Sequence, residues 1–200
     1  MFEKANVVFN KGVVRMIRHW EILNRKTLHD FKLMQIEGKE VRSPRTGKSM
    51  DVMAIHFPAW VVVLALTTEN EAIMVNQYRH GSENIHLELP GGLVDPDDPS
   101  PLQAAQRELL EETGYGSRDF RLMGECFPQP AILSNRCFFC LAMEAEFQQA
   151  QALDEGEDLE VIKIPMADIP LRIHSKSIDN GMSLLAFYYF WMYKKKGKDT

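Results

Sequence analysis

Three glutamates near the middle of the chain have the side chains and the spacing to hold a metal ion. Glu108, Glu111 and Glu112 occupy positions i, i+3 and i+4, so in a helix they project from one surface. Like charges at this spacing weaken a helix, and Gly114 predicts a helix end that places them at the negative end of the dipole. A divalent cation reverses both effects, because hard ions such as Mg²⁺ bind carboxylate oxygens together with substrate phosphates. The alternative is a solvated acidic helix end.

The residues around the glutamates favour a binding site over that alternative. Ala104 and Ala105 flank the acidic surface at the helical period, and we expect them to leave room for a metal ion and a ligand. Arg107 lies one helical turn before Glu111, where it can hold that carboxylate in one rotamer. Ahead of the helix a strand-like run ends in two glycines, residues 91–92, which let the backbone approach a ligand because no Cβ intervenes.

Residues 92–115 resemble the Nudix box. The second half, RELLEETGY at residues 107–115, matches the pattern R-E-U-x-E-E-x-G-U, in which U is apolar and Tyr115 is a permissive last position. The first half differs, because Asp98 occupies the usual glutamate position and one additional residue separates it from Arg107. We place the insertion in the loop at residues 99–101, outside the metal helix, which leaves the role of Asp98 open.

This resemblance implies a fold and a metal site. The implied fold is the α+β Nudix fold, a mixed β-sheet sandwiched between α-helices. The implied cofactor is Mg²⁺, with Mn²⁺ as a substitute. Glu108 and Glu112 are the implied principal ligands, and Glu111 is a further ligand or holds the metal-bound water that reacts. The carbonyl of Gly91 is an additional oxygen ligand.

Residues outside the box resemble the branch of ADP-ribose pyrophosphatases and nucleoside diphosphate sugar hydrolases. Arg79 ends a QYR tripeptide like the Q-[YF]-R element whose arginine contacts substrate, and its planar fork can grip a diphosphate. Glu88 stands in an E-x-P-G-G pattern that places it inside the site. Pro130, sixteen residues beyond Gly114, resembles the proline that distinguishes this branch. Without the resemblance, Arg79 could equally pair with Glu83 or Glu88, and Pro130 could belong to an ordinary turn.

An acidic loop over residues 153–160 contributes the proposed base. In the resembling branch a D-E-x-E-D run supplies a catalytic glutamate, and Glu155 and Glu157 occupy its two glutamate positions. We favour Glu155 as the general base over Glu157. Either is ionised at neutral pH and needs only to accept a proton from water that the metal has made more acidic. For most of the loop, a solvated charged segment is the alternative.

Composition and length limit the other classes of protein. The chain has 200 residues, which suits one domain with a substantial core. The net charge of -5 argues against a nucleic-acid-binding protein, which needs a basic face. The sequence has no apolar run near the roughly 20 residues of a membrane span. Polar residues interrupt the N-terminus, so we expect no export signal and a cytoplasmic protein.

Two cysteines form a CxxC motif that does not predict a zinc site. Cys137 and Cys140 fall in an apolar run that predicts a buried strand, and the chain lacks a second such pair. Residues three apart on a strand point to opposite faces, so one zinc ion cannot easily bind both. We expect buried, reduced thiols.

The chain divides into residues 1–57, an N-terminal antiparallel β extension, and residues 58–200, a Nudix hydrolase domain. In the extension, short alternating runs at residues 20–25, 31–36 and 50–57 predict strands with too little apolar surface to stand alone. The extension must therefore pack on the main domain or on a second subunit. In the resembling branch such a sheet is exchanged across a homodimer and helps to bind the nucleoside, which implies a homodimer here.

Apolar and β-branched runs predict the strands of the main domain. They cover residues 59–66, 72–78, 120–128, 135–146 and 161–164. A short broken helix is predicted at residues 166–174, and capping residues precede a final helix predicted at residues 182–195.

The expected activity is Mg²⁺-dependent hydrolysis of the pyrophosphate bond of ADP-ribose or another nucleoside diphosphate sugar. The products are a nucleoside monophosphate and a sugar phosphate. The alternatives are a Nudix pyrophosphohydrolase of another nucleotide, such as a dinucleoside polyphosphate or an oxidised nucleoside triphosphate, and a non-catalytic ADP-ribose-binding regulator. The glutamates of the box argue against the regulator. A Ca²⁺-binding module is disfavoured because the spacing of EF-hand ligands is absent.

Overall fold

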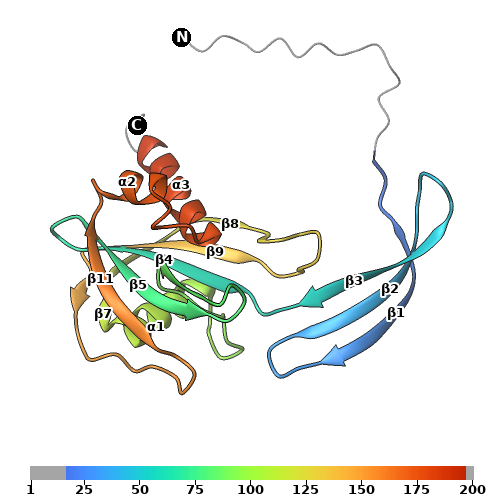
Figure 1. Ribbon diagram of the computed structural model, residues 1–200, viewed down its shortest axis with the longest axis horizontal. Helices are drawn as coiled ribbons and strands as arrows, with labels where there is room; N and C mark the ends of the chain where they lie inside the picture. The colour runs from blue at the N-terminus through green and yellow to red at the C-terminus, as the bar shows by residue number, and fades with distance from the viewer. Residues whose placement is uncertain (1–16, 197–200) are drawn as a thin grey trace, which may run out of the picture.

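The computed structural model describes residues 17–196, which form a main body and a separate N-terminal sheet (Figure 1). The strands of the N-terminal sheet pair with no strand of the main body among residues 17–196. In chain order the elements are β1 (Glu21–Asp30), β2 (Gln35–Arg42), β3 (Ser49–His56), β4 (Trp60–Leu66), β5 (Glu71–Arg79), β6 (Asn84–Glu88), α1 (Pro101–Thr113), β7 (Tyr115–Gly116), β8 (Asp119–Cys126), β9 (Cys137–Met143), β10 (Glu146–Phe147), β11 (Leu159–Pro165), α2 (Ile169–His174) and α3 (Gly181–Lys196).

A mixed sheet of six strands forms the centre of the main body. Its strand order is β11-β5-β4-β9-β8, and β6 pairs with β5. β4 runs antiparallel to β5 and parallel to β9. Both β4 and β9 are apolar at almost every position, as expected of strands that are covered on both faces. The α+β architecture is therefore confirmed, and so are the strands predicted for this sheet, except the one over residues 135–146.

Helices cover both faces of the main sheet, as Figure 1 shows. Alternate side chains of β4 point to opposite faces. On one face Val61 and Val63 pack in the same cluster as residues of α1, and on the other Val62 and Leu64 pack with residues of α3. α3 has 16 residues. Among residues 17–196, no helix has the length and apolarity that crossing a membrane requires.

Two alanines of α1 differ from the sequence prediction. Ala104 and Ala105 are fully buried and pack against β4, so they do not leave room beside the glutamates and that prediction is wrong. Their small size serves another purpose, because it lets the helix approach the sheet in a close-packed interior.

The two cysteines of the CxxC motif lie on opposite faces of β9, as predicted. Cys137 belongs to the cluster beneath α3 and Cys140 to the cluster beneath α1. Burial raises the pKa of each thiol to about 12. Both therefore remain neutral thiols, and they cannot jointly bind a metal ion.

The predicted strand over residues 135–146 is divided in two. β9 ends at Met143, and Glu144 adopts a positive φ of 52° that redirects the chain. β10 then pairs with β7 in a small separate sheet directly after α1. The end of β9 thus depends on a backbone conformation that the residue types alone do not predict.

The N-terminal sheet is antiparallel, with β2 between β1 and β3. β1 continues to Asp30, and Phe31 donates its N–H to the carbonyl of Met34 at 2.8 Å in the turn. The prediction that residues 31–36 form a strand is therefore wrong for the first four of these residues. Alternation of apolar and polar residues predicts strand positions poorly here, because nearly all side chains of β1 are exposed and no buried face fixes the pattern.

One loop of the main body joins the N-terminal sheet. The N–H of Ile55 donates to the carbonyl of Ile132 at 2.8 Å, and the N–H of Ser134 donates to the carbonyl of Ile55 at 3.0 Å. His56 lies between the two parts, with Nδ1 3.0 Å from Ser134 Oγ and Nε2 3.1 Å from a carboxylate oxygen of Glu37. The loop between β8 and β9 is thus fixed to β3.

Candidate functional site

α1 presents the three glutamates in its last two turns. The helix begins after Ser100, whose hydroxyl accepts the N–H of Gln103 at 3.3 Å. It ends at Gly114, which has a φ of 74° and donates its N–H to Leu110 at 2.9 Å. The predicted helix end is confirmed. The capped helix of 13 residues therefore fixes the positions of the three glutamates relative to the sheet.

The loop of Gly91 and Gly92 lies directly against two of these glutamates. Gly91 donates its N–H to Glu112 Oε2 at 2.8 Å. Its φ is 153°, and a Cβ there would lie 2.1 Å from the carbonyl oxygen of Val61. A Cβ on Gly92 would lie 2.5 Å from Glu108 Oε1. Only glycine lets the loop fit between β4 and the carboxylates.

Hydrogen bonding indicates which carbonyl of this loop is available to a ligand. The carbonyls of Pro90 and Gly92 accept the N–H groups of Val63 and Val61, both at 2.9 Å. Since successive carbonyls of an extended chain point in opposite directions, the carbonyl of Gly91 faces away from β4. This is the carbonyl that the sequence predicts as a metal ligand.

Glu108 and Glu112 are buried acids. Their exposed fractions are 8% and 3%. Burial raises the pKa of Glu108 to about 7, although the charge of Arg107 opposes the change. Burial also raises the pKa of Glu112 to about 8, against the effect of the Gly91 N–H. Burial disfavours the ionised forms of these two carboxylates, and a hard cation would stabilise them. Two buried carboxylates of this kind are therefore suitable ligands for such a cation.

Glu111 is oriented differently from its two neighbours. Its carboxylate is 41% exposed and accepts Arg107 Nη1 at 3.0 Å, as predicted from the one-turn spacing. Within residues 17–196, no three acidic, histidine or cysteine side chains converge closely enough to form a metal site by themselves. A cation at Glu108 and Glu112 would therefore need oxygen atoms from the backbone, the substrate or water as well.

Arg107 links α1 to the loop that precedes it. Besides both helix glutamates, it binds the carbonyl of Leu93 at 3.0 Å and Asp98 Oδ2 at 2.9 Å, both through Nη2. The hydrogen bond from Arg107 holds the pKa of Asp98 below its usual value. Asp98, whose role the sequence left open, thus anchors the arginine that orients Glu108 and Glu111.

Arg79, the last residue of β5, and Glu88, the last residue of β6, form a pair. Arg79 Nε donates to Glu88 Oε1 at 2.6 Å, so Glu88, and not Glu83, is the partner of this arginine. Glu88 is 1% exposed, and burial raises its pKa although Arg79 opposes this. Arg79 also lowers the pKa of Glu112, so its positive field reaches the buried acids of α1. Asn180 donates to the second oxygen of Glu88, a contact that the sequence did not indicate.

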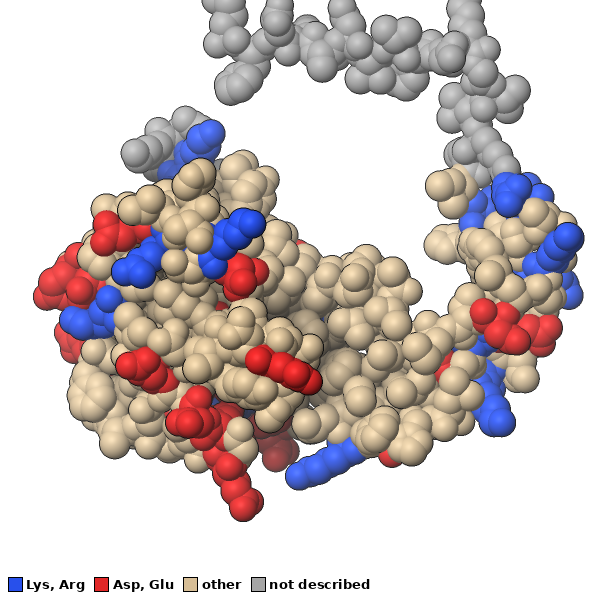
Figure 2. Space-filling view, in the orientation of Figure 1, with Lys and Arg blue, Asp and Glu red and all other residues tan. Residues whose placement is uncertain are grey.

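The acidic loop before β11 distinguishes its two glutamates. Glu157 is partly buried and is among the charges that raise the pKa of Glu108 and Glu112, whereas Glu155 is exposed. The N–H of Asp154 donates to Glu157 Oε2 at 3.0 Å. Figure 2 shows acidic side chains at the lower edge of the main body, where Figure 1 places this loop. Of the two, Glu157 is the one whose charge acts on the buried pair.

Pro130 lies apart from the hydrogen-bonded network of the glutamates. It is exposed in the loop between β8 and β9, and the neighbouring residues Ile132 and Ser134 bond to β3. The structure therefore joins Pro130 to the N-terminal sheet and not to α1.

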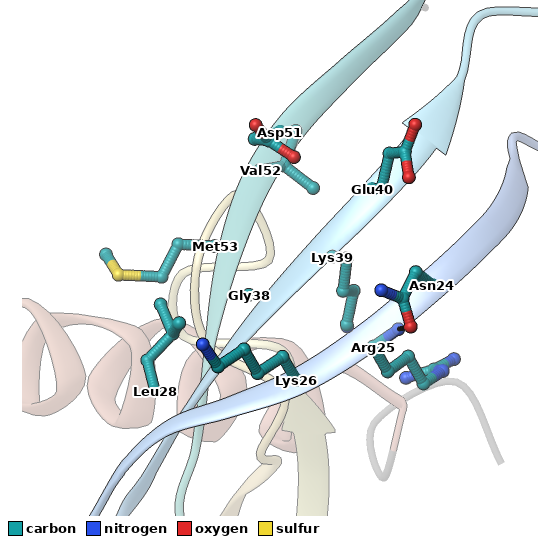
Figure 3. A pocket seen from close by; sticks show the side chains of 10 residues that line it. All are labelled: Asn24, Arg25, Lys26, Leu28, Gly38, Lys39, Glu40, Asp51, Val52 and Met53. Atoms are coloured by element: carbon teal, nitrogen blue, oxygen red, sulfur yellow. Dashed lines mark hydrogen bonds between the residues drawn. The ribbon is translucent and has the colours of Figure 1, made fainter.

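A hollow of about 460 Å³ lies on the N-terminal sheet, away from α1. Figure 3 shows Leu28 and Met53 beside Gly38 in this hollow, with charged side chains such as Arg25 and Lys39 around them. It contains none of the glutamates of α1. The hollow is thus a feature of the extension, separate from the acidic site.

Comparisons with known proteins agree with this geometry. Residues 56–182 match the family model described as the NUDIX domain. The ADP-ribose pyrophosphatase of Bacillus subtilis (strain 168) is 28% identical over 166 residues, which cover 82% of this chain and 89% of the relative. The ADP compounds hydrolase NudE of Escherichia coli (strain K12) is 28% identical over 167 residues, covering 84% and 89%.

A solved structure supports the fold independently. The crystal structure of an ADP compounds hydrolase superimposes with a TM-score of 0.80 at 22% identity, covering 92% of this chain and 98% of that chain. The mixed sheet between helices is therefore the Nudix fold predicted from the sequence. Because the family model spans more than half of the chain, this protein belongs to the Nudix family and is a Nudix hydrolase.

Proposed function

We propose that the protein hydrolyses the pyrophosphate bond of ADP-ribose or another nucleoside diphosphate sugar in a Mg²⁺-dependent reaction. The products are a nucleoside monophosphate and a sugar phosphate. The observation that carries this proposal is the buried pair Glu108 and Glu112 against the loop of Gly91 and Gly92. Two relatives, an ADP-ribose pyrophosphatase and an ADP compounds hydrolase, support the substrate class.

Oxygen atoms make up the proposed metal site. Glu108, Glu112 and the carbonyl of Gly91 would hold Mg²⁺, and Glu111 would act as a further ligand or hold bound water. Mn²⁺, which also prefers oxygen ligands, is the expected substitute. When bound, the cation supplies Lewis acidity to a phosphoryl oxygen and lowers the pKa of water.

Arg79 is the proposed diphosphate-binding residue. Its Nε is held by Glu88, its side chain is 45% exposed, and among residues 17–196 its two Nη atoms donate no hydrogen bond. A guanidinium group held in this way can donate two parallel hydrogen bonds to phosphate oxygens. Glu88 therefore acts on the substrate by fixing Arg79.

Glu157 is the proposed general base, and this changes the order that the sequence favoured. Its charge acts on Glu108 and Glu112, whereas Glu155 is exposed. A base must come within hydrogen-bonding reach of the proton that it accepts, and partial burial near the acids favours Glu157 for this task.

We also propose a homodimer formed through the N-terminal sheet. That sheet, its first turn and the residue before it expose a series of large apolar side chains, namely Trp20, Ile22, Leu28, Phe31, Leu33, Met50, Val52 and Met53. Exposed apolar area on this scale is typical of a surface that another chain covers. Pro130 would face the substrate from the loop that is fixed to this sheet. A cytoplasmic location is part of the proposal, since all three cysteines are free thiols.

A substrate panel tests the proposed reaction. The panel contains ADP-ribose, GDP-mannose, other nucleotide sugars, a dinucleoside polyphosphate and an oxidised nucleoside triphosphate. Each is incubated with Mg²⁺, with Mn²⁺ and with a chelator, and added phosphatase releases phosphate from monoester products. We expect hydrolysis of a nucleotide sugar that stops when the metal is removed.

Other outcomes of the panel would select an alternative. Preference for the polyphosphate or the oxidised nucleotide would assign a different Nudix activity. Tight binding of ADP-ribose with no turnover under any metal condition would indicate a regulator. Turnover that is unchanged by the chelator would contradict the metal assignment.

A further inference from the structure

The beginning of α3 holds the strand that contains Glu88. Three contacts join the two segments. They are His86 Nδ1 to Asp179 Oδ1 at 2.8 Å, Asn180 Nδ2 to Glu88 Oε2, and the N–H of Leu89 to Ser183 Oγ at 2.9 Å. These three contacts fix one face of β6 and the backbone that follows it to the beginning of α3, although the paired residues are 92 to 94 positions apart in the sequence.

Asn180 makes two kinds of hydrogen bond at this junction. Its Oδ1 accepts the N–H groups of Met182 and Ser183, both at 3.0 Å, and so caps α3. Its Nδ2 donates to Glu88. The reverse orientation of the amide would place an oxygen against the carboxylate and an NH₂ group against N–H donors. The helix end thus determines that a donor points at Glu88.

Both carboxylate oxygens of Glu88 are occupied. Oε1 accepts Arg79 Nε, and Oε2 accepts Asn180 Nδ2. The carboxylate is almost completely buried, with a side chain that is 2% exposed. A buried acceptor that loses its donor is costly, so without Asn180 the second oxygen would seek another partner. Arg79, whose Nε already binds Oε1, is the neighbouring residue that carries further N–H donors.

We propose that Asn180 is a positioning residue for substrate binding. By occupying Glu88 Oε2, it restricts the carboxylate to Arg79 Nε and keeps both Nη atoms available for the diphosphate. Among residues 17–196 those two atoms donate no hydrogen bond. This inference rests on the proposed function, in which Arg79 binds the diphosphate of the substrate.

The variant Asn180→Ser separates positioning from helix capping. Serine caps a helix about as well as asparagine but cannot reach Glu88 with an amide donor. We expect kcat/KM for the nucleotide sugar to fall about tenfold, mainly through a higher KM, with little change in Tm. Asp179→Ala is the matched control, because it removes the neighbouring contact to His86 and leaves Glu88 with both donors.

A double-mutant cycle with Arg79→Ala tests whether Asn180 acts through Arg79. If it does, Asn180→Ser causes no further loss of kcat/KM once Arg79 is absent. The same tenfold loss in both backgrounds, or no loss in the wild-type background, would overturn the proposal. A loss in Asp179→Ala as large as in Asn180→Ser would overturn it as well, because any loosening of α3 would then suffice.

A second measurement does not depend on activity. In ¹⁵N NMR spectra of the wild-type protein, we expect the Nε proton of Arg79 to be protected from exchange with water and the Nη protons to be unprotected. In Asn180→Ser the Nη protons should gain protection. Unchanged Arg79 signals would refute the positioning role. If wild-type protein hydrolyses no nucleotide sugar, the proposed function fails, and these signals alone still decide the role of Asn180.

Discussion

At the scale of single residues, the site depends on acids that folding withdraws from water. Glu112 is 3% exposed, and its hydrogen-bond donor is the N–H of Gly91. Its pKa is raised from 4.5 to about 8, mainly by burial. Such a group resists ionisation in the metal-free protein, so its ionised form becomes favourable only when positive charge arrives. The burial of Glu112 therefore lowers the stability of the metal-free protein and creates a site that favours a cation.

The raised pKa predicts how the stability of the metal-free protein depends on pH. Below pH 4.5 Glu112 is protonated in both states and contributes nothing. Between pH 4.5 and about 8 the unfolded state loses the proton while the folded state keeps it, so stability falls as pH rises. Glu112→Gln removes this loss and should raise the stability of the metal-free protein at pH 8 by a few kcal/mol at most.

Thermal unfolding in chelator at pH 5 and at pH 8 measures this effect. The difference in Tm between wild type and Glu112→Gln should be larger at pH 8. Added Mg²⁺ should raise the Tm of the wild type and not that of the variant, which should also lose turnover by at least about a hundredfold. A wild type whose metal-free stability rises between these pH values relative to the variant would contradict the assignment.

The two loop glutamates give a second prediction at this scale. Glu157→Gln should lower kcat by about 10² or more, which is typical for the loss of a general base, while Mg²⁺ still raises the Tm. Glu155→Gln is the matched control and should stay within a few-fold of wild type, because its side chain is exposed. If only Glu155→Gln loses turnover, the original preference from the sequence is correct.

At the scale of elements, a tight contact between a loop and a helix shapes the site. The Gly91–Gly92 loop follows β6, runs beside the first residues of β4 and lies against the carboxylates of α1. Arg107 fixes the preceding loop to the same helix through Asp98. A strand end, a glycine loop and a helix are therefore held together around the buried pair.

Gly92→Ala tests this contact. The new Cβ would lie 2.5 Å from Glu108 Oε1, so the carboxylate must move. We expect kcat/KM to fall by about tenfold or more, since small displacements at a reacting centre are costly. Gly81→Ala is the matched control, because a Cβ there meets no atom within 4 Å. Equal activities of the two variants would show that Glu108 does not need its observed position.

At the scale of the whole molecule, much of the apolar surface of the N-terminal sheet is exposed within residues 17–196. In Figure 1 it extends from the main body, and its contacts to that body run through β3 and the loop between β8 and β9. Three strands alone bury little apolar surface. The proposed homodimer would cover this surface and would bring a second chain close to the loop of Pro130.

A charge placed on this sheet should disrupt the proposed dimer. Leu28 is 53% exposed and lies over Gly38, where a Cβ would be 3.2 Å from its side chain. Leu28→Asp should shift the protein toward the monomer in light scattering, since a buried interface charge is costly. Leu171→Asp is the matched control, because Leu171 is 68% exposed on α2 of the main body. A wild-type protein that is monomeric at all concentrations would refute the dimer.

The sequence by itself determined the features that depend on local spacing. The i, i+3, i+4 glutamates, the helix end at Gly114 and the two glycines before the helix were all readable, because helix period and glycine chemistry act over a few residues. The apolar runs of β4 and β9 likewise predicted buried central strands. The opposite orientation of Cys137 and Cys140 followed from strand alternation alone.

Only the tertiary structure decided which side chains of different elements and loops meet. It paired Glu88 with Arg79 and with Asn180, which is 92 residues away, and it assigned Asp98 to Arg107. It also buried Ala104 and Ala105 in the core and brought the charge of Glu157 to bear on Glu108 and Glu112. The physical reason is that burial and hydrogen-bond partners are properties of packed elements, and a linear pattern of residue types contains no information on how loops place them.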